Sequence, residues 1–143
     1  MTSGTPASTN WNTAILYGYV ATGSVIGGVA RYLASLIILS GPGFPWATLF
    51  VNVTGSFIIG FYSTLSGPDG RLFASARQRQ FVMTGFCGGY TTFSTFSLET
   101  FKLLQSGMTR MAFTNIAVST VTWLLAVWLG YALASRLNRL KGS

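Results

Sequence analysis

The sequence has little charge and lacks the residues on which most catalytic and metal sites depend. Only 8% of its 143 residues are charged, against roughly 25% in an ordinary soluble domain, and Asp and Glu together number 2. There is no histidine, and Cys87 is the single cysteine. These absences exclude a Cys/His metal site, a disulfide framework and a nucleophile activated by histidine. With 9 basic and 2 acidic residues, the chain has too few charges to cover the surface of a soluble domain of this size, which excludes a soluble globular protein as well.

Long apolar stretches, separated by short polar breaks, make up most of the chain. Each reaches the roughly 20 residues that a membrane-spanning helix needs. The four stretches cover residues 14–39, 46–65, 81–104 and 111–134. Short connections between such segments predict one antiparallel bundle, and thus an all-α membrane protein with four transmembrane helices over residues 13–143. Residues 1–12 are polar and uncharged, and they predict a flexible N-terminal tail.

The basic residues are divided unequally between the two ends of such a bundle. With four spans, both termini and the second connection share one side, which holds Arg71, Arg77, Arg79, Arg136, Arg139 and Lys141. The other side holds Lys102 and Arg110, and Arg31 lies within the first span. Positive charge collects in cytoplasmic loops, so the termini are expected in the cytoplasm. With this apolar content, the net charge of +7 favours an anionic lipid bilayer over nucleic acid as a partner.

The third stretch contains a glycine pair followed by a threonine pair. Gly88 and Gly89 precede Tyr90, Thr91 and Thr92, and this is poor helix sequence. We therefore predict that the third helix is broken within the membrane, where freed backbone groups must be satisfied by protein, ions or water. In the alternative, the hydroxyls bond back to their own helix and the glycines only pack.

Two phenyl rings follow this break. Phe93 and Phe96 are three residues apart and share a helix face. An aromatic ring has a positive edge, so two ring edges beside a narrow path would favour a small anion. In the alternative, both rings fill the bundle or face lipid. Hydroxyl residues interleave with the rings and leave both interpretations open: Thr92, Ser94, Thr95 and Ser97.

Polar side chains also interrupt the second and fourth stretches. Asn52 lies seven residues into an uncharged segment, and Thr48 shares its helix face. The Asn52 amide has two N–H donors, which could serve an anion or hold two helices together. In the fourth stretch, Asn115, Ser119 and Thr122 form a similar stripe. Polar stripes on several spans indicate a path rich in hydrogen-bond donors.

Charges and small residues complete the pattern. Arg31 and Glu99 lie nearest to membrane depth, where charged residues suggest function. Arg31 could attract anions at the mouth of a path or extend its side chain to the surface. Glycines in the first two stretches predict close helix packing: Gly18, Gly23, Gly27, Gly28, Gly55 and Gly60.

Three segments together resemble the Fluc fluoride channels, also called CrcB proteins. They are Gly-Gly-Tyr-Thr-Thr-Phe-Ser-Thr-Phe-Ser from Gly88, Gly-Gly-Val-Ala-Arg-Tyr from Gly27, and Thr-Leu-Phe-Val-Asn-Val-Thr-Gly-Ser-Phe from Thr48. The three motifs occur in the family's order and spacing, and the resemblance covers the four spans.

The resemblance implies a passive, fluoride-selective channel in the inner or plasma membrane that lets fluoride leave the cytoplasm. It implies an antiparallel dimer with two pores and a structural sodium ion held by backbone carbonyls, here at Gly88 and Thr91. The other implied positions are the ring pair Phe93 and Phe96, the pore amide Asn52, the polar-track residues Ser119 and Asn115, and the vestibule residues Arg31 and Glu99. Thr48, Thr95 and Ser97 are further pore candidates.

Several alternatives stay open. The unequal loop charge disfavours insertion in both orientations, so the partner in the dimer could be a second copy or an oppositely oriented paralogue. A small proton-coupled drug exporter would need a titratable carboxylate in mid-span, whereas Asp69 lies in a loop and Glu99 near a helix end. A membrane enzyme lacks histidine and paired carboxylates here. A purely structural subunit would explain the glycines but not the run of hydroxyls and rings.

Overall fold

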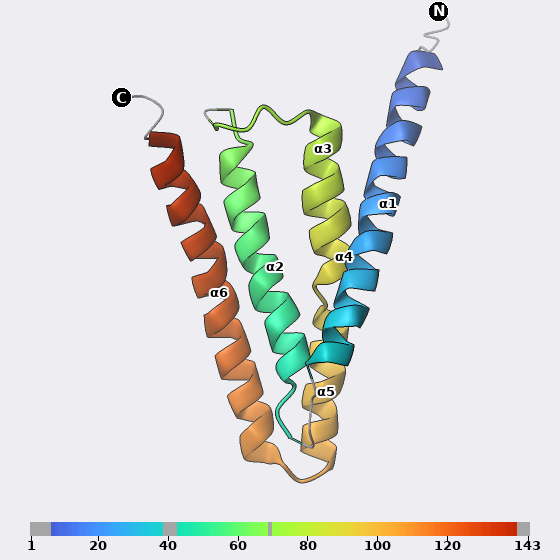
Figure 1. Cartoon of the computed structure of the whole chain (residues 1–143). Coiled ribbons are helices and arrows are strands. Elements are labelled where there is room, and N and C mark those ends of the chain that lie inside the picture. The colour runs from blue at the N-terminus through green and yellow to red at the C-terminus, as the bar shows by residue number, and fades with distance from the viewer. Residues whose placement is uncertain (1–6, 39–42, 69, 140–143) are drawn as a thin grey trace, which may run out of the picture.

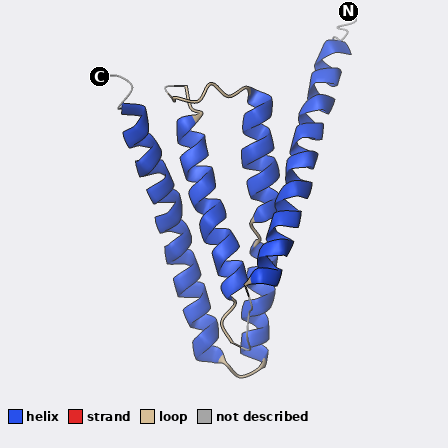
Figure 2. Ribbon diagram, viewed as in Figure 1, coloured by secondary structure: helices blue, strands red, loops and turns tan. Residues whose placement is uncertain are grey.

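The computed structural model describes residues 7–38, 43–68 and 70–139, and every regular element in these residues is helical (Figure 2). In chain order the elements are α1 (Ala7–Ile37), α2 (Trp46–Leu65), α3 (Ala76–Gln80), the π-helical segment η1 (Phe81–Cys87), α4 (Gly88–Tyr90), α5 (Phe93–Gln105) and α6 (Thr109–Arg139). Three helices are long and apolar enough to cross a membrane: 11–37, 46–65 and 109–139. The protein is therefore all-helical, with at least these three candidate spans among the described residues.

The helices lie side by side with alternating direction (Figure 1). α1 and the series from α3 to α5 run one way along the bundle, and α2 and α6 run the other way. Hydrogen bonds tie the three parts of one end together. Arg77 Nη2 donates to Asn12 Oδ1 at 3.2 Å, and the backbone N–H of Arg71 donates to Asn138 Oδ1 at 3.1 Å. The start of α1, the connection after α2 and the end of α6 therefore share one end of the molecule.

α1 begins earlier than the sequence analysis expects. It starts at Ala7, so residues 7–12, which were assigned to a flexible tail, belong to the helix. The physical reason is local, since no glycine or proline occurs between Ala7 and Tyr17 to end the helix. Residues 1–6 of the predicted tail lie outside the described residues.

Glycines bring α1 against the third helical series. A Cβ at Gly23 would collide with Phe81 O, and one at Gly27 would collide with Phe86 O. From the η1 side of the same contact, a Cβ at Gly85 would lie 2.8 Å from Val20 O of α1. Because backbone meets backbone here, any side chain would push the helices apart. The prediction of close packing is confirmed for Gly23 and Gly27.

α2 packs on α6 in the same manner. A Cβ at Gly60 would collide with Val127 O, and one at Gly130 would collide with Phe57 O. Gly55 of α2 packs against a different segment, the residues between α4 and α5, where its Cβ would collide with Thr91 Cγ2. The prediction is thus confirmed for Gly55 and Gly60 as well.

Gly18 and Gly28 behave differently from the other glycines of α1. In the described part of the chain, nothing lies within 4 Å of a Cβ built at either position. These two glycines therefore make no close helix contact in the described part of the chain, because each lines a cavity instead: Gly18 beside Phe81, and Gly28 beside Thr48 and Glu99.

Candidate functional site

The backbone leaves helical geometry at two residues between α4 and α5. Thr91 has φ −82° and ψ 159°, and Thr92 has φ −151° and ψ 121°. Thr92 then caps α5, since the N–H of Thr95 donates to Thr92 Oγ1 at 3.1 Å. Extended residues cannot continue the i to i−4 bonding of a helix, so the backbone N–H and C=O groups at this point need partners from outside the helix.

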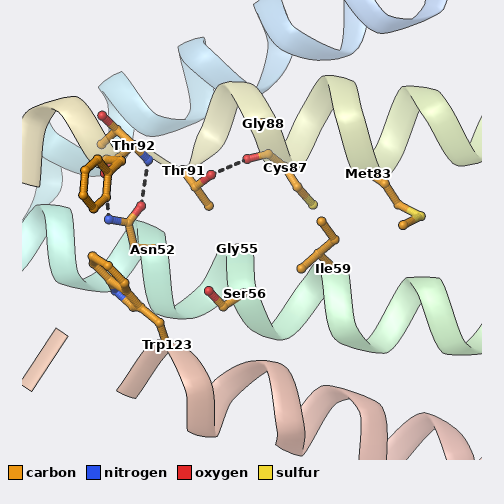
Figure 3. Close-up of a pocket in the computed structure, with 11 residues that line it drawn as sticks. Asn52, Gly55, Ser56, Ile59, Met83, Cys87, Gly88, Thr91, Thr92 and Trp123 are labelled. Atoms are coloured by element: carbon orange, nitrogen blue, oxygen red, sulfur yellow. Dashed lines mark hydrogen bonds between the residues drawn. The ribbon is translucent and has the colours of Figure 1, made fainter. Parts of the chain in front are cut away.

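The Asn52 side chain of α2 satisfies both backbone groups of Thr92. Asn52 Nδ2 donates to Thr92 O at 2.9 Å, and the Thr92 N–H donates to Asn52 Oδ1 at 2.7 Å (Figure 3). Both residues are buried. The amide therefore substitutes for the missing helical partners and joins α2 to the interruption.

This pairing changes which carbonyls before the interruption are engaged. In a continuous helix the N–H of Thr92 would bond to Gly88 O, and the N–H of Thr95 would bond to Thr91 O. Here those two N–H groups donate to Asn52 Oδ1 and Thr92 Oγ1 instead. The carbonyls of Gly88 and Thr91 thus lose the donors that a helix would supply.

A cavity of about 310 Å³ lies beside the interruption. Its walls come from α2, η1, α4 and α6, and from the start of α5: Asn52, Gly55, Ser56, Ile59, Met83, Cys87, Gly88, Thr91, Thr92, Phe93 and Trp123. Asn52 and Trp123 lie at one end and Met83 lies at the other (Figure 3). Most of the lining is apolar and uncharged, so the few hydrogen-bond donors decide what such a cavity can hold.

Of the predicted ring pair, Phe93 lines this cavity and Phe96 packs against Phe93. The rings of Phe93 and Phe96 have centroids 5.7 Å apart and are tilted by 46°. Phe96 is 8% exposed and meets Trp123 at 5.0 Å in an edge-to-face contact, whereas Phe93 is 72% exposed. A buried ring held by a second ring keeps its orientation, while Phe93 presents most of its surface outside the single chain.

A buried chain of hydrogen bonds begins on α6 and ends at the backbone carbonyl of Phe96 on α5. Ser119 Oγ donates to Asn115 Oδ1 at 3.2 Å, and Asn115 Nδ2 donates to Thr100 Oγ1 at 2.8 Å. Thr100 Oγ1 in turn donates to Phe96 O at 2.8 Å. The chain connects α6 to α5. Thr100 was not predicted, although its position four residues after Phe96 places it on the same face of α5.

Two further hydroxyls that the sequence singled out form hydrogen bonds within their own helices. Thr122 Oγ1 donates to Val118 O at 2.7 Å, and Ser97 Oγ donates to Phe93 O at 2.9 Å. Ser97 is exposed. In these two cases the hydroxyl returns to its own helix, as the alternative interpretation expects. Trp123, which no prediction singled out, lies four residues after Ser119 and so takes the place next along the stripe.

The predicted vestibule residues meet in a second cavity, of about 440 Å³. Arg31 of α1 and Glu99 of α5 both line it, together with Thr48 and Thr95. The Thr48 side chain hydrogen-bonds the Glu99 carboxylate, and Glu99 Oε2 is buried without a hydrogen-bond partner among the described residues. Thr92 lines both cavities, so the interruption lies between them.

Comparison with known proteins points to one family. A family model described as "CrcB-like protein, Camphor Resistance (CrcB)" matches residues 18–131. Over 132 residues the chain is 67% identical to "Fluoride-specific ion channel FluC 1" of Rhodopseudomonas palustris (strain BisB18), covering 91% of this chain and 94% of the relative. A protein of the same name from Bradyrhizobium diazoefficiens is 62% identical over 133 residues, 93% of this chain and 94% of the relative. "Fluoride-specific ion channel FluC" of Opitutus terrae is 52% identical over 130 residues, 90% and 98% of the two chains.

Proposed function

Because the chain belongs to the CrcB-like protein family, we propose that it is a passive fluoride-selective channel that lets fluoride leave the cytoplasm. It is a multi-pass membrane protein and not an enzyme. The observation that carries the proposal is the interruption at Thr91 and Thr92, whose backbone groups are bonded by the Asn52 amide at the end of a largely apolar cavity.

The proposed pore uses weak and uncharged donors. Asn52 Nδ2 carries two hydrogens, and Thr92 O accepts one of them, so the other is available to an ion in the cavity. Phe93, which lines the cavity, and Phe96, which packs against it, would offer positive ring edges to the ion. Fluoride is small and tightly hydrated, so donors must replace its water, while the lack of full charges keeps any one site from holding it too tightly.

The proposed path continues from the interruption into the second cavity. Asn115 and Ser119 are further pore candidates, but they bond to each other and to Thr100, so an ion would enter there only by replacing those hydrogen bonds. Thr48, Thr95, Arg31 and Glu99 surround the second cavity, which we assign to a vestibule. There the Arg31 guanidinium would raise the local concentration of anions. Ser97 is the weakest pore candidate, because its hydroxyl is exposed and bonds to Phe93 O.

We propose that the series from α3 to α5 forms a fourth span, broken within the membrane, and that two chains assemble in antiparallel fashion with two pores. Residues 76–105 cover the length of the neighbouring helices (Figure 1). Phe93 supports the dimer, because a pore ring that is 72% exposed in one chain needs a partner to enclose it. The partner is a second copy in our proposal, and an oppositely oriented paralogue is the alternative.

A structural sodium ion at the centre of this dimer is consistent with the chain's own oxygens. Unwound backbone carbonyls in membrane proteins are typical ligands of sodium. The Gly88 and Thr91 carbonyls lack their helical donors, and Gly88 is exposed, with nothing in the described part of the chain within 4 Å of a Cβ built there. When bound, the ion would hold these carbonyls together across the two chains.

Fluoride efflux from liposomes tests the proposal. Vesicles that contain the purified protein and are loaded with potassium fluoride should release it once valinomycin balances the charge, and chloride-loaded vesicles should stay full. The initial rate should rise linearly with the gradient and ignore an imposed proton gradient. Vesicles that retain fluoride would refute the channel, and efflux that saturates and follows protons would favour an exporter.

The orientation of the subunits needs a separate test. A cysteine-reactive label applied from one side of the membrane to a C-terminal cysteine should reach about half of the chains if a homodimer inserts both ways. Accessibility from one side alone would exclude the antiparallel homodimer and leave the paralogue as partner.

A further inference from the structure

One side chain that lines the cavity carries a buried donor, the indole N–H of Trp123. Trp123 Nε1 is buried and has no hydrogen-bond partner among the described residues. An unpaired buried N–H costs roughly 1–3 kcal/mol, so its retention calls for a partner that the described part of the chain does not provide. The indole is a donor only, and any such partner must therefore accept a hydrogen bond.

The location of Trp123 narrows down this partner. Its ring lines the cavity and lies at the same end as Asn52 (Figure 3). It also follows Asn115 and Ser119 at four-residue spacing along α6, so it is the member of that stripe that reaches the cavity. The edge-to-face contact with Phe96, at 5.0 Å and 74°, holds the indole plane.

We propose that the Trp123 indole N–H donates directly to fluoride in the cavity, beside the second hydrogen of the Asn52 amide. This inference rests on the proposed function and adds a residue that determines selectivity. A neutral N–H replaces one water of a small anion and offers nothing to a cation. Because it carries no full charge, it does so without binding the ion too tightly for conduction.

Removing the N–H while keeping an aromatic ring tests the inference. Trp123→Phe should slow fluoride efflux from liposomes about tenfold, as expected when one hydrogen bond to a charged group is lost. Trp128→Phe is the matched control, because Trp128 is on the same helix but 59% exposed, and its efflux should equal that of the wild type. Equal efflux from Trp123→Phe and the wild type would overturn the inference and leave the channel intact. A wild type that carries no fluoride would overturn both.

Indole NMR of the unmodified protein gives a readout that does not depend on flux. The sequence has four tryptophans, and Trp11→Phe, Trp46→Phe and Trp128→Phe assign the Trp123 resonance by elimination. In ¹⁵N-labelled protein, the Trp123 Hε1 signal should shift with sodium fluoride and saturate, but not move with sodium chloride. A signal that ignores fluoride would show that the N–H faces the Phe96 ring or a bound water instead, and would overturn the inference.

Discussion

Two polar regions, to each of which α6 contributes, differ in the partners of their hydrogen-bond donors. In the first region, the side chains of Ser119, Asn115 and Thr100 bond to one another, and Thr100 donates to the backbone carbonyl of Phe96. Around the cavity, the Trp123 N–H has no partner among the residues that the structure describes, and Asn52 has a second amide hydrogen. The first region joins α5 to α6, and we propose that the second binds an ion. The comparison teaches that residue type alone does not separate a structural polar group from a functional one, because the bonding partners decide.

The largest effect should come from a charge at the cavity end. Asn52→Asp removes the donor to Thr92 O and sets a carboxylate against that carbonyl and against any anion in the path. We expect fluoride efflux to fall to the level of empty liposomes, measured with a fluoride electrode.

Gel filtration should show that this variant still assembles, and Asn115→Asp is a comparison within the structural region. Normal conduction by Asn52→Asp would remove Asn52 from the pore and would end the distinction between the two regions.

The rings should give the next largest effect. Phe96→Ile and Phe93→Ile keep apolar volume but remove the positive ring edge, which is worth up to about tenfold in flux. We expect each to slow efflux by about that factor without loss of assembly. Leu98→Ile, at an exposed position on α5, is the control and should conduct normally. Undiminished efflux from both ring variants would reject the role of the rings.

The structural region should respond in stability more than in flux. Thr100→Val removes the acceptor of Asn115 Nδ2 and the donor to Phe96 O, and it leaves a buried amide hydrogen unpaired. This should lower the free energy of unfolding by about 1–3 kcal/mol, seen as a lower melting temperature in detergent, with flux within about threefold of the wild type. The exposed Thr120, which bonds only to Ile116 O, supplies the control Thr120→Val. A flux loss as large as that of Asn52→Asp would place this chain in the conduction path.

The smallest effect is expected at Thr122. Its hydroxyl bonds to Val118 O and Ser119 O on its own helix, so no other element depends on it. Thr122→Val should change the free energy of unfolding by no more than about 0.5 kcal/mol and leave efflux unchanged. A clear loss of flux would return Thr122 to the polar stripe that its spacing first suggested.

Features with a local cause can be predicted from the sequence. The pair Gly88 and Gly89 before Thr91 and Thr92 predicts poor helix, and extended residues are found there. Prediction from the sequence was less successful for helix faces. Spacing placed Thr122 in the stripe, whereas Trp123 reaches the cavity, because three- and four-residue steps point to different neighbours. Gly28 was expected to pack like Gly27, yet only Gly27 meets another helix.

The sequence by itself determined that this is an apolar, helical membrane protein with a weak point after Tyr90. Hydrophobic run length and residue propensity act over a few neighbouring residues, so they can be read along the chain. Only the tertiary structure decided that Asn52 bonds both groups of Thr92, forty positions further on. It also decided that the Trp123 N–H has no hydrogen-bond partner in the described ranges 7–38, 43–68 and 70–139. A hydrogen bond depends on distance and direction between helices, and these follow from packing that no local pattern contains.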